Sequence, residues 1–79
     1  MNKNEAKELI REYESARTGI ELLNDQSISV LNARVNKQSI RADVVYRDYS
    51  EGTSKRCDHQ LYPIDLLEQF HKTRVLPTA

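Results

Sequence analysis

Apolar residues recur at helical spacing along the first part of the chain. The members of this stripe are Leu9, Ile10, Tyr13, Ala16, Ile20 and Leu23. Most steps between them are four or three residues, which is the spacing of one face of an α-helix. The pattern predicts an amphipathic helix over about 3–23, with its stripe buried against a sheet, another helix or a partner.

The ends of this helix carry their own signals. Asn2 followed by Glu5 forms a capping-box arrangement with Asn in place of Ser or Thr. Gly19 leaves two alternatives at the other end. It can cap the helix in a left-handed conformation, or the helix continues to about Leu23 at a cost of about 1 kcal/mol for the glycine. The continuous helix is preferred, because the stripe stays in phase across Gly19.

Alternating apolar and polar residues predict three strands, at about 30–35, 40–49 and 55–61. The side chains expected to face inward are Leu31, Ala33 and Val35, then Ile40, Ala42, Val44 and Tyr46, then Cys57, His59 and Leu61. Ile28 and Val30 have the opposite parity to Leu31, so either a bulge near Val30 or a later strand start is expected. Turns are predicted at 36–39 and 50–54.

A second helix is predicted over about 63–74, with Pro63 at its first position. The fold class is therefore α+β: one domain over residues 1–79, with a helix, a three-stranded antiparallel meander and a second helix. The predicted core is Leu9, Ile10, Tyr13, Ala16, Ile20, Leu23, Leu31, Ala33, Val35, Ile40, Ala42, Val44, Leu61, Ile64, Leu67 and Phe70.

This order of elements resembles the double-stranded RNA-binding fold at the level of topology. That family contacts phosphates through lysines that open its last helix and through a histidine in its first hairpin loop. In this chain the last helix opens with Pro63, Ile64 and Asp65, and the hairpin loop is 36–39, Asn-Lys-Gln-Ser. The resemblance therefore covers topology, and the acidic helix start would repel a phosphate.

Composition limits the cellular setting and the range of partners. Twelve basic residues balance twelve acidic ones in 79 residues, so no global field attracts nucleic acid or membrane. Cys57 is the only cysteine, so we expect no intrachain disulfide and no cysteine-based zinc site. We also expect no cofactor. The polar N-terminus and short apolar runs predict a cytoplasmic protein without a membrane segment. A core this thin, without a disulfide or metal, favours a homodimer.

No group of residues indicates catalysis. Cys57 and His59 lie two apart on one predicted strand, too far for a nucleophile–base hydrogen bond, and we expect a packed thiol and a core histidine. Asp65 and Glu68 are expected to act as helix-start acids. Two glycines do not form a phosphate-binding loop. We therefore expect a protein that is not an enzyme.

The sheet face away from the helices is the candidate site. Pairing Val35 with Ile40 places Arg34 opposite Arg41, which is unfavourable unless an acid, with Asp43 nearest, or an anion lies between them. In the second hairpin, a register with Tyr46 opposite His59 would place Arg47 opposite Asp58 and Tyr49 opposite Arg56. The predicted partner-binding residues are Arg34, Arg41, Asp43, Arg47, Tyr49, Arg56 and Tyr62.

Arginine and tyrosine are enriched where proteins bind one another. We therefore expect a non-catalytic protein-binding module that acts stoichiometrically, and we associate it with phage or mobile-element accessory proteins that inhibit a host defence enzyme. One alternative is a nucleic-acid-binding domain that uses the arginine face. A second is a structural oligomerisation unit built on the first helix. A merely solvated face, with ion pairs to Asp43, Asp48 and Asp58, explains the same pattern without a partner.

Overall fold

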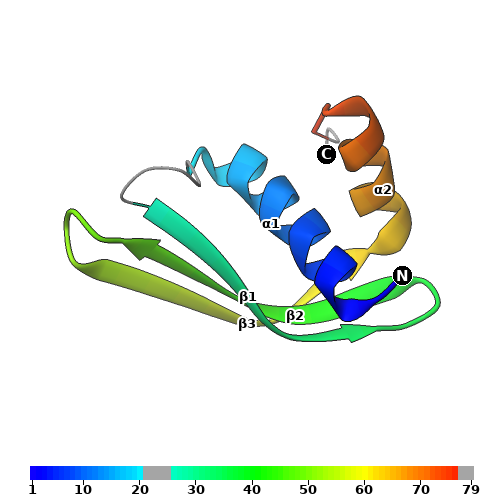
Figure 1. Cartoon of the computed structure of the whole chain (residues 1–79), viewed down its shortest axis with the longest axis horizontal. Coiled ribbons are helices and arrows are strands. Elements are labelled where there is room, and N and C mark those ends of the chain that lie inside the picture. Colours follow the sequence, from blue (N-terminus) through cyan, green and yellow to red (C-terminus); the bar gives the residue numbers. More distant parts are fainter. Residues whose placement is uncertain (21–25, 77–79) are drawn as a thin grey trace.

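The computed structural model describes residues 1–20 and 26–76. Its elements are α1 (Lys3–Thr18), β1 (Gln26–Val35), β2 (Ser39–Asp48), β3 (Thr53–Pro63) and α2 (Ile64–Thr73). The strands form one antiparallel sheet in the order β1-β2-β3, and both helices lie on the same side of it (Figure 1). The predicted α+β arrangement, with a helix on each side of a three-stranded meander in the sequence, is confirmed.

The start of α1 has the capping box that the sequence predicts. The side-chain oxygen of Asn2 accepts a hydrogen bond from the backbone N–H of Glu5 at 2.8 Å. The side-chain amide of Asn2 donates to the Glu5 carboxylate at 3.0 Å. Two side chains close the first turn in this way, which satisfies a helix-end donor that would otherwise have no partner.

The end of α1 corrects the sequence prediction. The helix stops at Thr18, and Gly19 adopts a left-handed conformation with φ 74° and donates its N–H to the Ser15 carbonyl at 2.9 Å. Glycine adopts this conformation without a Cβ clash. The predicted helix through about Leu23 is wrong, and the alternative with Gly19 as the cap is the one observed. Leu23 itself lies outside the described residues.

The first hairpin has the predicted register, with Val35 opposite Ile40 and Arg34 opposite Arg41. Between Leu31 and Arg34, β1 holds one residue more than β2. Asn32, with φ 55°, lies within this β-bulge. The bulge falls just after Leu31 and moves that side chain to the face opposite the helices, where it is 37% exposed. The predicted inward position of Leu31 is therefore wrong.

The second hairpin differs from its predicted register. Tyr46 lies opposite Lys55 and Arg47 opposite Ser54, so the predicted pairs of Tyr46 with His59 and Arg47 with Asp58 are wrong. In the observed register, β2 and β3 stay paired closer to the turn than in the predicted register. The Asp48 carboxylate accepts hydrogen bonds from the backbone N–H groups of Ser50 and Glu51, at 3.1 and 3.2 Å, and so holds a tight turn that sets this register.

A second bulge lies in β3, where one extra residue falls between the partners of Ala42 and Val44. His59 adopts φ 56° within it. The side-chain alternation reverses at this point, so that Leu61 is 60% exposed and Tyr62 only 5% exposed. The predicted inward positions of His59 and Leu61 are wrong, because a bulge shifts every later side chain of the strand to the other face.

The hydrophobic core lies between the helices and one face of the sheet. Its buried members are Ala6, Ile10, Ile28, Val30, Ala33, Ile40, Ala42, Val44, Tyr62 and Leu67. Phe70 is buried as well. Leu9, Tyr13, Ile20, Val35 and Ile64 are partly buried against this cluster. Ala16 is exposed, contrary to prediction, because it lies about 120° around the helix from Ile10, the middle of the buried stripe.

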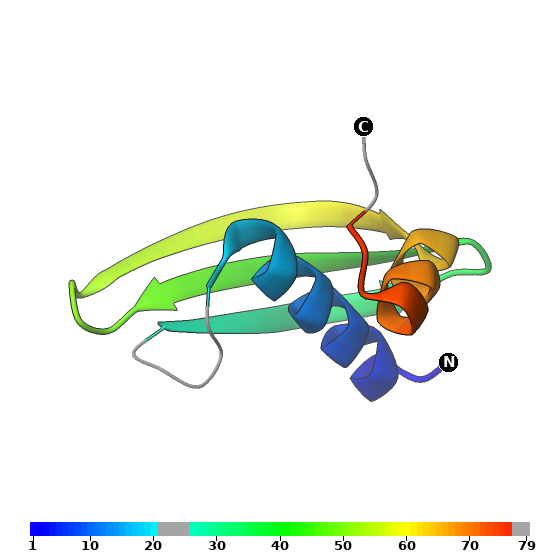
Figure 2. The ribbon, with the colours of Figure 1, turned by 90° about the horizontal axis from the view of Figure 1, so that it is seen from above.

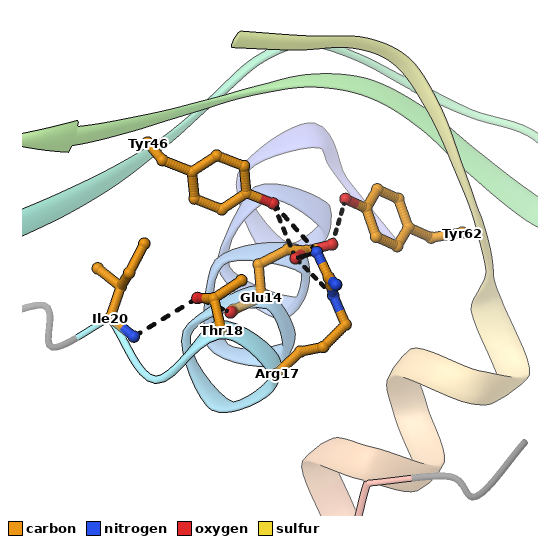
Figure 3. A network of polar contacts seen from close by, with 6 residues as sticks. All are labelled: Glu14, Arg17, Thr18, Ile20, Tyr46 and Tyr62. Atoms are coloured by element: carbon orange, nitrogen blue, oxygen red, sulfur yellow. Dashed lines mark hydrogen bonds and ion pairs between the residues drawn. The ribbon is translucent and has the colours of Figure 1, made fainter. Parts of the chain in front are cut away.

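The face of α1 that meets the sheet includes a buried carboxylate. Glu14 is 3% exposed and accepts hydrogen bonds from the hydroxyls of Tyr62 at 2.7 Å and Tyr46 at 2.8 Å (Figure 3). Arg17, one turn further along α1, donates to the same carboxylate at 2.9 Å. Burial is the largest cause, and the hydrogen bond to Glu14 the second, of a raised pKa in both tyrosines. The pKa of Tyr46 is raised to about 12. This network joins α1 to β2 and β3.

The second helix covers one end of the sheet beside α1 (Figure 2). Tyr13 of α1 meets Tyr62 and Phe70 edge to face, with ring centroids 6.2 and 5.7 Å apart. Arg74 ends α2 in a left-handed conformation, and its N–H donates to the Phe70 carbonyl at 2.7 Å. Because both helices lie on one side of the sheet, neither of them covers the opposite face.

Candidate protein-binding surface

The candidate surface is the face of the sheet opposite the helices, here called the outer face. No helix or strand of the described chain lies on this side of the sheet (Figure 1). The outward-pointing residues are Ser27, Ser29, Leu31 and Arg34 of β1, Arg41, Asp43, Val45 and Arg47 of β2, and Ser54, Arg56, Asp58 and Leu61 of β3. Five of the predicted site residues, the four arginines and Asp43, are brought together here.

Arg34 and Arg41 form a like-charge pair across β1 and β2. The two residues are direct partners in the strand register, and both are exposed. Side chains at directly opposite positions have Cβ atoms about 4.5–5.5 Å apart, where equal charges repel. Within residues 1–20 and 26–76, neither guanidinium makes a hydrogen bond or ion pair. The pair is therefore uncompensated in the described chain.

Asp43, the nearest candidate for an acid between those arginines, makes its hydrogen bonds to other groups. It is 7% exposed. One carboxylate oxygen accepts from the Asn32 side chain at 2.8 Å, and the other from the backbone N–H of His59 at 2.9 Å. These two hydrogen bonds, first the one from Asn32, hold the pKa of Asp43 below its ordinary value. A single carboxylate on the central strand thus supports the bulges of both neighbouring strands.

The other two arginines of the outer face have partners. Arg56 forms ion pairs with Asp58 and, at 3.3 Å, with Asp43. Hydrogen bonding to Asp58, the largest effect, raises the pKa of Arg56. Arg47 lies within 3.5 Å of the Ser29 hydroxyl. Among the four arginines of the outer face, Arg34 and Arg41 are therefore the two without a hydrogen bond or ion pair in the described residues.

The two predicted tyrosines have different positions. Tyr49 is 63% exposed, just beyond the end of β2, and accepts a hydrogen bond from the Ser27 hydroxyl at 3.4 Å. That bond is the largest cause of its lowered pKa. Tyr62 is in the core and bonded to Glu14. Its assignment to the outer face is wrong, because the bulge at His59 reverses the orientation of the residues that follow.

Three apolar residues of this surface were not among the predicted site residues. Leu31 and Leu61 are exposed on it, and Leu61 lies directly opposite Arg41. Val45 is 6% exposed, so neighbouring side chains of the same face cover it. The sequence did hold a signal for Leu31: if Ile28 and Val30 face the core, Leu31 must face outward. The bulge that exposes Leu61 contains no glycine or proline, so the sequence gives no signal for that bulge.

A hollow lies over the two bulges on the outer face. Its lining residues are Asn32, Arg34, Arg41, Asp43 and His59, and its volume is about 300 Å³. The bulges place Asn32 and His59 at its sides, while the central strand contributes the floor. An opening of this size, bordered by two exposed guanidinium groups, can admit a small polar group from another molecule.

The structure separates Cys57 and His59, the two residues that could have formed a nucleophile–base pair. Cys57 is half-buried on the helix side, opposite Val44, whereas His59 lines the hollow on the outer face. The two side chains are therefore on different sides of the sheet. No cluster of three His, Cys, Asp or Glu residues within 1–20 and 26–76 has the geometry to hold a metal ion. None of the helices described is long and apolar enough to span a membrane.

Comparison with known proteins identifies no relative. No protein-family model, no curated protein and no solved structure matches the chain. Function is therefore inferred from the outer face itself.

Proposed function

We propose that this chain is a non-catalytic protein-binding module and that the outer face is its binding surface. One observation carries the proposal: Arg34 and Arg41 lie uncompensated beside exposed Leu61 on a sheet face that no described element covers. Exposed leucines beside arginine combine apolar contact with a specific charge, as binding surfaces of proteins do.

A protein partner fits this surface better than a nucleic acid. Asp43 and Asp58 lie among the arginines, and Leu31 and Leu61 stand exposed near them. A surface of alternating sign selects a partner by matching charges in register. A nucleic-acid site gains its affinity from many phosphate contacts and is strongly basic. The net charge of zero therefore favours a protein partner over a nucleic acid.

The proposed mode of action is stoichiometric occlusion of the partner. A chain of 79 residues that carries a binding surface can block the surface or active site of a larger protein. A phage or mobile-element accessory protein that inhibits a host defence enzyme would act in this way, and we include that role in the proposal. A nucleic acid remains the alternative ligand of the same face.

The test is a double charge reversal, Arg41→Glu with Arg47→Glu. Both side chains are exposed on β2, so we expect the circular dichroism spectrum to be retained and partner binding to be lost. Tagged wild-type protein is first used to capture the partner from host extract for mass spectrometry. Binding of the purified partner is then measured by titration calorimetry.

The matched control reverses two charges away from the outer face, Lys3→Glu with Lys72→Glu, on α1 and α2. It changes the net charge equally and should keep the affinity. Retained affinity in the Arg41→Glu/Arg47→Glu protein would reject the outer face as the site. A steep loss of wild-type affinity with added salt, together with binding to any DNA or RNA of similar length, would favour the nucleic-acid alternative.

A further inference from the structure

The unusual feature of the outer face is the like-charge pair of Arg34 and Arg41. Equal charges directly opposite one another in a sheet are destabilising. The register that makes them neighbours is set by the first hairpin, in which Val35 and Ile40 point toward the core. A change of register would expose those residues, so the fold keeps the two guanidinium groups together.

The nearest carboxylate cannot relieve this pair without disturbing the sheet. Both oxygens of Asp43 are bound, to Asn32 and Arg56 on one side and to the His59 backbone N–H on the other. Turning the Asp43 side chain toward Arg41 would leave the bulge in β3 without its acceptor. A counter-charge that pairs with Arg34 and Arg41 would therefore have to come from outside the described residues.

The place for such a counter-charge is the hollow of about 300 Å³ between the two bulges. Arg34 and Arg41 both line it, as does His59. A guanidinium presents several N–H donors in one plane and matches the two oxygens of a carboxylate. Two guanidinium groups facing one anion remove their mutual repulsion and gain charge-assisted hydrogen bonds.

We propose that Arg34 and Arg41 bind the carboxylate of an aspartate or glutamate side chain of the protein partner, seated in the hollow between the two bulges. This inference rests on the proposed function and names the group that the outer face recognises. Leu61, opposite Arg41 and 60% exposed, lies beside the carboxylate and contacts the apolar part of the same segment. The partner segment is therefore acidic with an adjacent apolar residue.

A phosphate backbone fits the hollow less well. Asp43 lines it and Asp58 lies on the next strand, and both repel closely spaced phosphates. Duplex DNA carries a negative charge about every 1.7 Å along its axis, so more than one phosphate would face these aspartates. A single side-chain carboxylate adds one negative charge between Arg34 and Arg41, whose two positive charges exceed the one negative charge of Asp43 in the hollow.

The experiment uses the full-length protein and three probes. They are an acetylated and amidated hexapeptide of alternating glutamate and leucine, the same peptide with glutamine in place of glutamate, and a single-stranded hexanucleotide. Binding is followed by NMR through the side-chain Nε–H signals of the arginines at low ionic strength. We expect the glutamate peptide to move the signals of Arg34 and Arg41, and the glutamine peptide to leave them in place.

The decisive variant is Arg34→Gln with Arg41→Gln, beside Lys72→Gln as a control with one charge removed from α2. We expect the double variant to weaken binding of the glutamate peptide at least about tenfold, and the control to keep it. Unchanged affinity in the double variant, or tighter binding of the hexanucleotide than of the peptide, overturns the inference.

These measurements do not require the partner to be known, so the two proposals fail separately. If the glutamate peptide binds at Arg34 and Arg41 while the Arg41→Glu/Arg47→Glu protein keeps its captured partner, the carboxylate site stands and the proposed function falls. If the outer face proves to bind the partner but the glutamate peptide leaves both arginines unmoved, the carboxylate site falls alone.

Discussion

At the scale of single residues, two carboxylates organise the molecule from opposite sides of the sheet. Glu14 accepts hydrogen bonds from Tyr46 and Tyr62 on the helix side, and Asp43 supports the two bulges on the outer face. Buried polar groups are costly unless their hydrogen bonds are complete. In the described chain no buried side-chain polar atom lacks a hydrogen-bond partner, and the oxygens of both carboxylates accept hydrogen bonds.

The first prediction concerns Glu14. Replacing it with glutamine removes the charge and leaves too few acceptors for two hydroxyls and Arg17, so Glu14→Gln should lower the free energy of unfolding by about 1–3 kcal/mol. Urea denaturation followed by circular dichroism measures this loss. The matched control is Glu12→Gln on the same helix, whose exposed partners are His71 and Arg74, with an expected loss of about 0–1 kcal/mol. Equal losses would contradict the proposed role of the Glu14 network.

The second prediction concerns Asp43 and pH. Its pKa is below the ordinary 3.8 in the folded chain because of the bonds from Asn32 and His59. The unfolded chain therefore binds protons more readily, so the contribution of Asp43 to stability is present above about pH 4 and is lost as the pH falls through the lowered pKa. Asp43→Asn should flatten the decrease in melting temperature between about pH 5 and pH 2. The same slope in both proteins would show that Asp43 is not stabilised by these contacts.

At the scale of secondary-structure elements, two bulges determine which residues reach the outer face. Asn32 and His59 each adopt positive φ without being glycine, a conformation that ordinary residues rarely adopt. Each bulge reverses the side-chain alternation of an edge strand. The central strand keeps its alternation unbroken, so Arg41 and Arg47 lie on the face that a simple period of two predicts.

The third prediction concerns α2, which closes the core. Leu67 is fully buried, so Leu67→Ala should cost about 2–5 kcal/mol, a large part of the stability of so small a domain. Phe70→Ala should act in the same way. Leu61→Ala removes the same atoms from an exposed position and should change stability by no more than about 0.5 kcal/mol. Thermal denaturation compares the three variants, and an unshifted transition for Leu67→Ala would contradict the packing of α2.

At the scale of the whole molecule, a neutral chain presents two different faces. Both helices cover one side of the sheet (Figure 1), and the strand register places the four arginines on the other side. A net charge of zero therefore conceals a local excess at Arg34 and Arg41. The homodimer expected from the sequence stays a prediction. It was expected because the core is thin and holds no disulfide or metal; within the described chain, Ala6 and Ile10 of α1 are already fully buried.

Local sequence by itself determined the number, type and order of the elements. It also determined the Asn2 cap and the pairing of Arg34 with Arg41, because periodicity, capping and hairpin register act between residues close in the chain. The tertiary structure decided where the bulges fall. The His59 bulge is held by Asp43, sixteen residues away in sequence, so alternation within β3 cannot locate it. For the same reason the exchange of Leu61 and Tyr62 between the two faces, and the bond from Tyr62 to Glu14, depend on contacts that exist only once the sheet has formed.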